Sequence, residues 1–311
     1  MYDLSQIING LQNPGLVPVE LNSLYYTRLG TQKRNPNGVN FFEEDWDNLL
    51  ILDAYRHDLF AELAETYGLP GQLESKISAG SATPEFLATN IDGKDLRDTV
   101  YVTATTMLYR EAVLSDSIEI DVHEIIDIWA DSIDFGEWGV LPESVTERTL
   151  EAIEEYPNKR IVAHYTQPHL PFLGETGKRI YDEFEGRSVW KAKQTGRLDI
   201  SDETLWKAYR ENAEYVTEHV ADIVREFPGK TVVTADHGQL IGERVWPLPV
   251  KHYSHPAGLW VEELVEVPWL TVENGSRRRI VSERQDEEYT PDRDELDEKA
   301  RNHLRNLGYV D

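Results

Sequence analysis

The sequence predicts an α/β protein built on a mostly parallel sheet that is covered by helices on both faces. Short, continuous apolar segments recur along the chain, and segments with the spacing of amphipathic helices lie between them. Continuous apolar strands are buried on both faces, which is the pattern of parallel sheets. Forty per cent of the 311 residues are hydrophobic, which is enough for a large core.

Five segments have the composition of buried strands. They are 48–52, 99–103, 160–164, 231–235 and 267–272. The clearest helix is expected between Ser201 and Phe227, with Ser201 as its N-cap and an apolar stripe along one side. Pro228 and Gly229 end this helix just before the fourth strand. Active sites of such proteins are usually built at the carboxyl ends of the strands.

The chain is expected to form one large domain, residues 46–311, after an N-terminal arm, residues 1–45. Residues 174–200 are polar and rich in Lys and Arg, so we expect an insertion or lid outside the core. Residues 273–297 are strongly charged and are expected to follow the surface before a last short helix.

Composition excludes several classes of protein. The chain has 57 acidic and 31 basic residues, a net charge of −26 that repels nucleic acid and anionic lipid. The acidic residues are dispersed along the whole chain, which resembles the proteins of salt-loving archaea. An ordinary acidic enzyme is the alternative. The absence of Cys excludes disulfides, Cys-ligated zinc and a Cys nucleophile. There is no apolar run of roughly 20 residues and no signal peptide, so we expect a cytoplasmic protein without a membrane span.

Two of the predicted strands end in acidic residues. Asp53 follows the first strand, where it could also simply cap the next helix. Asp236 and His237 follow the fourth strand, and Gly238 permits the sharp turn that would let both bind one ion. Carboxylate with imidazole suits zinc or manganese better than calcium or magnesium, which prefer oxygen ligands.

Two further segments carry polar groups toward predicted strand or helix ends. Pro84 suits a first helical position, so Thr83 is predicted as N-cap, where its hydroxyl would face a bound anion such as phosphate. A plain helix cap is the alternative. His164 and His169 follow the third strand, and His255 lies in a later turn. A lone His is usually structural, but several near strand ends indicate a site.

In this order, the motifs resemble the alkaline phosphatase superfamily, specifically its sulfatase-like branch. The resemblance rests on a strand ending in Asp53, the hydroxyl of Thr83, His-x-x-x-Pro-His-x-Pro-Phe (164–172), Asp-His-Gly-x-x-x-Gly-Glu (236–243), His255 and the closing 307–310. It covers the chain from about Asn48 onward. It implies a three-layer α/β/α sandwich, and it implies that residues 46–311 are a catalytic domain.

The resemblance also implies a metal centre. One divalent ion, Zn²⁺ or Mn²⁺ rather than Ca²⁺ or Mg²⁺, would be held by Asp53, Asp236 and His237, with the nucleophilic hydroxyl of Thr83 as a further ligand. A second ion is possible. Such coordination lowers the pKa of the hydroxyl and prepares it for attack on phosphorus or sulfur.

The remaining site residues are also assigned from the resemblance. His169 and His255 would bind the substrate oxyanion, protonate the leaving group or complete a second metal site. His164 would bind substrate or pack beneath the site. Thr83 is expected as nucleophile over Ser81, although the lipoteichoic-acid-synthase-like branch favours Ser81, and the proline after Thr83 lacks a useful N–H.

The sequence departs from true sulfatases in two ways. They use a formylglycine made from Cys or Ser, whereas this chain has no Cys, and Ala54 replaces the second Asp after their first strand. The resemblance therefore implies a hydrolase or transferase of phosphate mono- or diesters, acting on a small-molecule or glycan-linked substrate. A sulfatase and a non-catalytic binder of anions or glycans are the alternatives. The basic residues of 174–200 either recruit that substrate, which is a hypothesis, or form a solvated basic loop. They are Lys178, Arg179, Arg187, Lys191 and Lys193.

Overall fold

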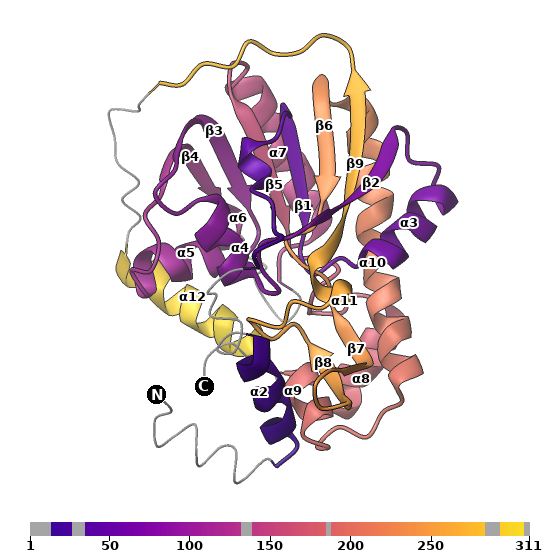
Figure 1. Ribbon diagram of the computed structural model, residues 1–311. Coiled ribbons are helices and arrows are strands. Elements are labelled where there is room, and N and C mark those ends of the chain that lie inside the picture. The colour runs from indigo at the N-terminus through magenta and orange to yellow at the C-terminus, as the bar shows by residue number, and fades with distance from the viewer. Residues whose placement is uncertain (1–13, 27–34, 132–138, 185–187, 284–292, 308–311) are drawn as a thin grey trace.

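The computed structural model describes residues 14–26, 35–131, 139–184, 188–283 and 293–307. A seven-stranded sheet in the order β2-β9-β6-β1-β5-β3-β4 runs through its centre (Figure 1). The strands are β1 (Asn48–Leu52), β2 (Gln72–Ile77), β3 (Asp95–Thr103), β4 (Asp121–Asp127), β5 (Arg160–Tyr165), β6 (Gly229–Thr234) and β9 (Glu266–Asn274).

The five central and left-hand strands, β6, β1, β5, β3 and β4, are parallel, and β9 runs antiparallel to both β6 and β2. The strands predicted from apolar runs correspond to β1, β3, β5, β6 and β9. The two edge strands, β2 and β4, were not predicted. Most of their residues are partly or fully exposed, so they lack the continuous apolar run that marks a buried strand.

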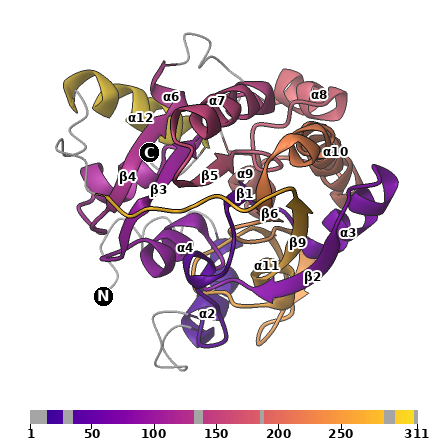
Figure 2. The ribbon, with the colours of Figure 1, turned by 90° about the horizontal axis from the view of Figure 1, so that it is seen from above.

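Helices cover both faces of the sheet, which confirms the predicted three-layer α/β/α class (Figure 2). On one face, α10 (Asp202–Glu226) packs against α7 (Pro142–Glu155) and α3 (His57–Thr66). On the other lies α4 (Thr83–Asn90), and the 3-10 turn η2 (Phe41–Glu43) precedes β1 along the chain. Ser201 caps α10 as predicted, because its hydroxyl accepts a hydrogen bond from Thr204 N at 3.0 Å.

The remaining elements lie around this sandwich. They are α2 (Leu16–Leu24), α5 (Met107–Tyr109), the π-helix η3 (Arg110–Leu114), α6 (Ile128–Asp131), α8 (Glu175–Glu183), α9 (Val189–Gln194), β7 (Leu240–Val245), β8 (Val250–Ser254), α11 (Glu262–Val265) and α12 (Arg293–Leu307). Strands β7 and β8 form a separate hairpin. None of the helices in the described ranges combines the length and the apolar character that crossing a bilayer requires.

The described residues of 174–200 form two helices that take part in the core, so the prediction that this segment lies outside it was wrong. Ile180 of α8 and Trp190 of α9 are buried in the main hydrophobic cluster. The Trp190 ring meets Phe172 edge to face at 5.5 Å. Each helix has one apolar side, and the many Lys and Arg residues of the sequence concealed it.

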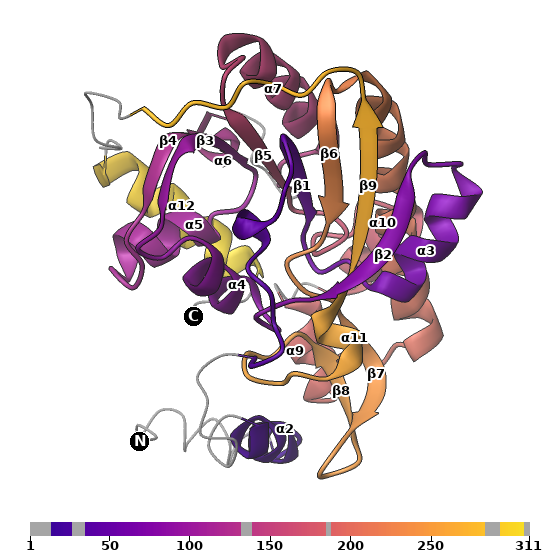
Figure 3. The same cartoon turned by 45° about the horizontal axis from the view of Figure 1, so that its top comes forward.

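The first described part of the N-terminal arm, α2, lies against the β7–β8 hairpin (Figure 3). The Asn22 amide donates to the carbonyls of Val245 and Leu248 at 3.1 and 3.0 Å. Residues 275–283 contain no helix or strand and are mostly exposed, as expected, but the final helix is 15 residues long rather than short. Residues 1–13 and 27–34 of the predicted arm, residues 284–292 and residues 308–310 of the closing motif lie outside the described residues, whereas Phe41 and Phe42 of the arm are buried in the main hydrophobic cluster.

Candidate metal centre and active site

The candidate site lies where β1, β5 and β6 end, at the lower edge of the sheet in Figure 1. These strands are neighbours, and Ile51 of β1 is in register with His164 of β5 and with Thr234 of β6. Asp53 and Asp236 each follow their strand by one or two residues. Since the three strands are parallel, Asp53, His164 and Asp236 meet at one edge.

These side chains form a tight, buried cluster. One ligand atom from each of Asp53, His164 and Asp236 lies within 4.8 Å of the others. His237 joins them, with Nε2 3.4 Å from Asp236 Oδ2 and 3.7 Å from Asp53 Oδ1. Asp53 is 3 % exposed and the other three are fully buried. All three metal ligands expected from the resemblance are therefore together, and His164 is a fourth candidate.

The cluster has the chemistry of a divalent-cation site. Asp53 Oδ1, His164 Nε2 and Asp236 Oδ2 are buried, and none has a hydrogen-bond partner among the described residues. Burial raises the pKa of Asp53 well above its usual range, and the nearby Asp236 carboxylate raises it further. Buried carboxylates and imidazoles without partners are costly unless a cation satisfies them, so the residues present fit a bound metal.

Hydrogen bonds on the outer side of the cluster orient its members. Asp236 Oδ1 accepts from Ala54 N at 3.1 Å and from His237 N at 2.9 Å, which leaves Oδ2 facing the centre. His237 Nδ1 donates to the carbonyl of the next residue at 2.8 Å, so the lone pair of Nε2 faces the cluster. His164 Nδ1 shares a hydrogen bond with the Tyr101 hydroxyl at 2.9 Å. Such outer contacts fix the ligand geometry of metal sites.

The sharp turn at this site follows Asp53 rather than His237. Ala54 has a φ of 61°, in the left-handed region. Gly238 has no such φ, so the reason given for it from the sequence was wrong. A Cβ atom at residue 238 would lie 2.1 Å from the Glu263 carbonyl oxygen, so glycine is required there by a close backbone approach.

The structure brings Thr83 to the cluster and holds Ser81 elsewhere. Thr83 is fully buried, and its Oγ1 lies 3.3 Å from His237 Nε2. The Ser81 hydroxyl lies within 3.0 Å of Glu85 Oε2 and 2.9 Å of the Pro256 carbonyl, and it accepts from Leu259 N at 3.1 Å. The N-cap of α4 is Ala82, and Thr83 is the first helical residue, so its prediction as N-cap was off by one position.

His169 and His255 lie beside the cluster as a pair. Their Nε2 atoms are 3.0 Å apart, and the His255 ring stacks on His237 with centroids 4.3 Å apart. His169 Nδ1 donates to the Leu170 carbonyl at 3.3 Å, so its Nε2 can accept the hydrogen of His255 Nε2. Burial lowers the pKa of His169 to about 4 and that of His255 well below its usual range. Both rings are therefore neutral at pH 7.

Residues that were not expected from the sequence support the site from outside. The buried Tyr209 hydroxyl of α10 donates to the Ala54 carbonyl at 2.6 Å and accepts from Arg56 N at 3.0 Å. Arg56 also forms an ion pair with Glu243, which joins the turn after β1 to the segment after β6. Tyr209 and Arg56 belong to no motif, and Glu243 ends the motif at 236–243 without a role assigned to it from the sequence. The register of neighbouring strands is the one feature that could have assigned His164 to the metal.

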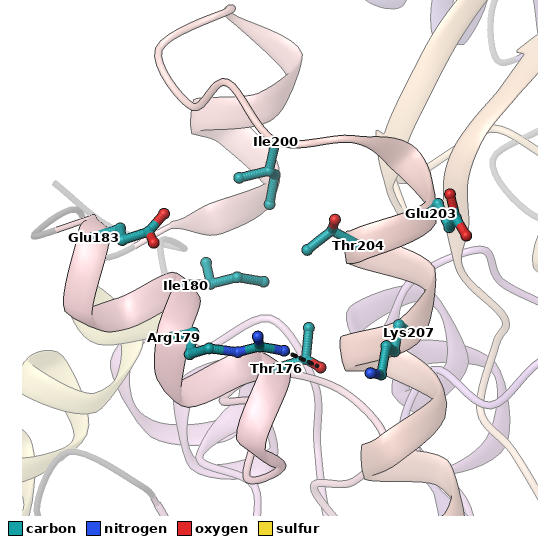
Figure 4. Close-up of a pocket in the computed structure, with 8 residues that line it drawn as sticks. All are labelled: Thr176, Arg179, Ile180, Glu183, Ile200, Glu203, Thr204 and Lys207. Atoms are coloured by element: carbon teal, nitrogen blue, oxygen red, sulfur yellow. Dashed lines mark hydrogen bonds between the residues drawn. The ribbon is translucent and has the colours of Figure 1, made fainter.

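A cavity of about 280 Å³ lies between α8 and α10, apart from the cluster (Figure 4). Its lining residues are Thr176, Arg179, Ile180, Glu183, Ile200, Glu203, Thr204 and Lys207. They include two cations and two anions but none of the candidate site residues. Of the five basic residues expected to recruit substrate, Arg179 lines this cavity, and Arg187 lies outside the described residues.

No protein-family model and no curated protein sequence matches the chain. Several solved structures are similar to it. The integral membrane lipooligosaccharide phosphoethanolamine transferase A of Neisseria meningitidis is 12 % identical, with a TM-score of 0.46 over 73 % of this chain and 48 % of its own. This chain therefore spans about half the length of that transferase.

Two further structures represent other branches. A putative sulfatase from Bacteroides thetaiotaomicron is 10 % identical, with a TM-score of 0.46 over 86 % of this chain and 72 % of its own. A protein of the alkaline phosphatase superfamily from Vibrio parahaemolyticus is 11 % identical, with a TM-score of 0.44 over 84 % and 70 %. The superfamily expected from the sequence is thus among the structures similar to this chain.

Proposed function

We propose that the chain is a metal-dependent hydrolase or transferase of phosphate esters with Thr83 as its nucleophile. The observation that carries this proposal is the buried cluster of Asp53, His164, Asp236 and His237, with the Thr83 hydroxyl 3.3 Å from His237 Nε2. A divalent metal ion held there, Zn²⁺ or Mn²⁺ by its mixed oxygen and nitrogen donors, would lower the pKa of the hydroxyl and offset negative charge on the phosphoryl group.

The chain's own residues supply the rest of the reaction. Thr83 Oγ attacks phosphorus, which forms the Oγ–P bond and breaks the bond to the leaving oxygen. The neutral pair of His169 and His255, whose Nε2 atoms share one hydrogen, takes up the proton released from the Thr83 hydroxyl and passes it to the leaving oxygen. Water or an acceptor hydroxyl then attacks the phosphothreonine and releases Thr83. The substrate would be a small-molecule or glycan-linked phosphate ester.

Phosphate is favoured over sulfate because the nucleophile is an unmodified threonine and the chain has no Cys from which a formylglycine could be made. The second carboxylate of true sulfatases is missing, because Ala54 stands in its place and contributes only a backbone N–H, which binds Asp236. This arrangement leaves two carboxylates and two imidazoles, a donor set that differs from the all-oxygen shell preferred by calcium.

The test measures turnover of matched aryl phosphate, phosphodiester and sulfate esters with Mn²⁺ or Zn²⁺, at low and high salt because of the charge of −26. We expect Thr83→Ala to lower turnover by at least about 10³-fold, and Ser81→Ala to retain most of it. Mass spectrometry after rapid acid quench should find phosphate on Thr83. Turnover lost in Ser81→Ala but kept in Thr83→Ala would overturn the nucleophile, and preference for the sulfate ester would overturn the substrate class.

A further inference from the structure

Asn212, in the middle of α10, directs its whole amide at one short backbone segment. Its Nδ2 lies 3.3 Å from the Pro168 carbonyl oxygen, 3.0 Å from that of His169 and 2.9 Å from that of Pro171. Its Oδ1 accepts from Leu173 N at 2.6 Å. Asn212 is fully buried. All four contacts therefore hold the segment that carries His169.

This segment, residues 166–174, has no helix or strand to fix its backbone. Pro168 and Pro171 lack an N–H and cannot donate from their backbone, while the buried carbonyls of the segment require partners. Helix α10 is 25 residues long, and one side of it is buried in the core. Asn212 is thus a direct link between a rigid helix and an irregular segment.

His169 is held on both sides of its peptide backbone. Its N–H donates to the Asp53 carbonyl at 3.1 Å, and its own carbonyl accepts from Asn212. These two contacts leave the imidazole directed at His255, with the Nε2 atoms 3.0 Å apart. Movement of the backbone by about an ångström would break this histidine pair, and the segment is bound to Asp53 through that residue's backbone carbonyl and not through its carboxylate.

We propose that Asn212 is a positioning residue, which acts on the reaction by holding His169 against His255. The inference rests on the proposed function, because His169 and His255 supply the proton to the leaving group. It assigns Asn212 no contact with substrate or metal. A residue that served stability alone would lower the free energy of unfolding and leave the turnover of the folded protein unchanged.

The test compares Asn212→Leu with Asn48→Leu in metal-loaded, full-length protein. Asn48 is a matched control: it is 1 % exposed and its amide donates to Pro228 O and Thr231 Oγ1, at the opposite end of the sheet. We expect Asn212→Leu to lower kcat by about 10–100-fold with KM changed much less, and Asn48→Leu to stay within about twofold. Both variants should lose comparable unfolding free energy.

Two further measurements separate positioning from general damage. In a His169→Ala background, Asn212→Leu should have little further effect on kcat, because the residue it positions is already absent. Metal affinity measured by titration calorimetry should stay within about threefold of wild type, because the four candidate ligands lie on other segments. If Asn212→Leu does not fold, Asn212→Asp retains the shape and the acceptor for Leu173, and it should show the same loss of kcat.

The inference is overturned if Asn212→Leu is as active as Asn48→Leu, or if its effect on kcat is undiminished beside His169→Ala. These results would leave the proposed function standing, because wild type would still show metal-dependent turnover. Wild type without such turnover on any phosphate ester would instead refute the proposed function, and the role of Asn212 with it.

Discussion

Replacing Tyr209 with Phe removes a single oxygen atom beside the candidate metal centre. The hydroxyl is fully buried, and it bridges the Ala54 carbonyl at 2.6 Å and Arg56 N at 3.0 Å. The ring of Phe fills almost the same volume, so packing is preserved. The variant therefore leaves one backbone acceptor and one backbone donor without a partner in the turn that follows Asp53.

The structure sets the size of two effects. A buried polar group left without its hydrogen bond costs about 1–3 kcal/mol, so the pair should cost about 2–6 kcal/mol of unfolding free energy. The same turn carries Ala54, whose N–H binds Asp236 Oδ1 at 3.1 Å. Loss of an outer contact of this kind weakens metal binding by about 10–100-fold, and we expect that range for Tyr209→Phe.

Urea unfolding in the presence of a chelator measures the first effect, and titration calorimetry with Mn²⁺ or Zn²⁺ measures the second. Tyr165→Phe is the matched control, because Tyr165 is equally buried and its hydroxyl shares one hydrogen bond, with Thr146 at 3.1 Å. It should cost about 1 kcal/mol and leave metal affinity unchanged. Equal effects of the two variants on both quantities would refute the reasoning.

Two further predictions concern the same region. Gly238→Ala places a Cβ 2.1 Å from the Glu263 carbonyl oxygen, so we expect it to lower the free energy of unfolding by at least about 1–3 kcal/mol, measured by urea unfolding. Burial lowers the pKa of His164 and of His169 to about 4. The unfolded chain therefore binds protons below about pH 6.5 that the folded, metal-free protein excludes. Stability should fall from pH 6.5 to pH 4 by roughly 3 kcal/mol for each His, and His169→Gln should show a shallower dependence.

Elements with a strong local pattern could be predicted from the sequence. Strands β1, β3, β5, β6 and β9 have long apolar runs because neighbouring strands and helices bury them. Edge strands β2 and β4 have exposed polar residues and do not stand out from loops. The core helices α8 and α9 were also missed, because charged side chains hid their apolar sides.

The candidate site residues that belong to local motifs could be named from the sequence. Asp53, Asp236 and His237 could be assigned because they directly follow buried strands. His164 was expected to bind substrate or to pack beneath the site. It is a candidate metal ligand because β5 lies next to β1 in the sheet, and this strand order cannot be read from local motifs. Tyr209 lies on the buried side of α10, where the sequence gives no sign that its hydroxyl has a partner.

Asn212 illustrates what local patterns cannot show. Within α10 it is one polar residue among many, and nothing in its neighbours marks it. Asn212 is 43 residues from His169 in the sequence, but the fold brings its Nδ2 to 3.0 Å from the His169 carbonyl oxygen. Contacts of this kind follow from tertiary packing and not from propensity or periodicity.

The most direct test of the account is metal-dependent turnover of an aryl phosphate by the purified protein, measured with chelator and after re-addition of Mn²⁺ or Zn²⁺, beside Asp236→Asn. The account predicts turnover that chelator abolishes and metal restores. It also predicts that Asp236→Asn binds the metal far more weakly and stays inactive at metal concentrations that saturate wild type. Full turnover in the presence of chelator, or Asp236→Asn with the metal affinity and activity of wild type, would contradict it.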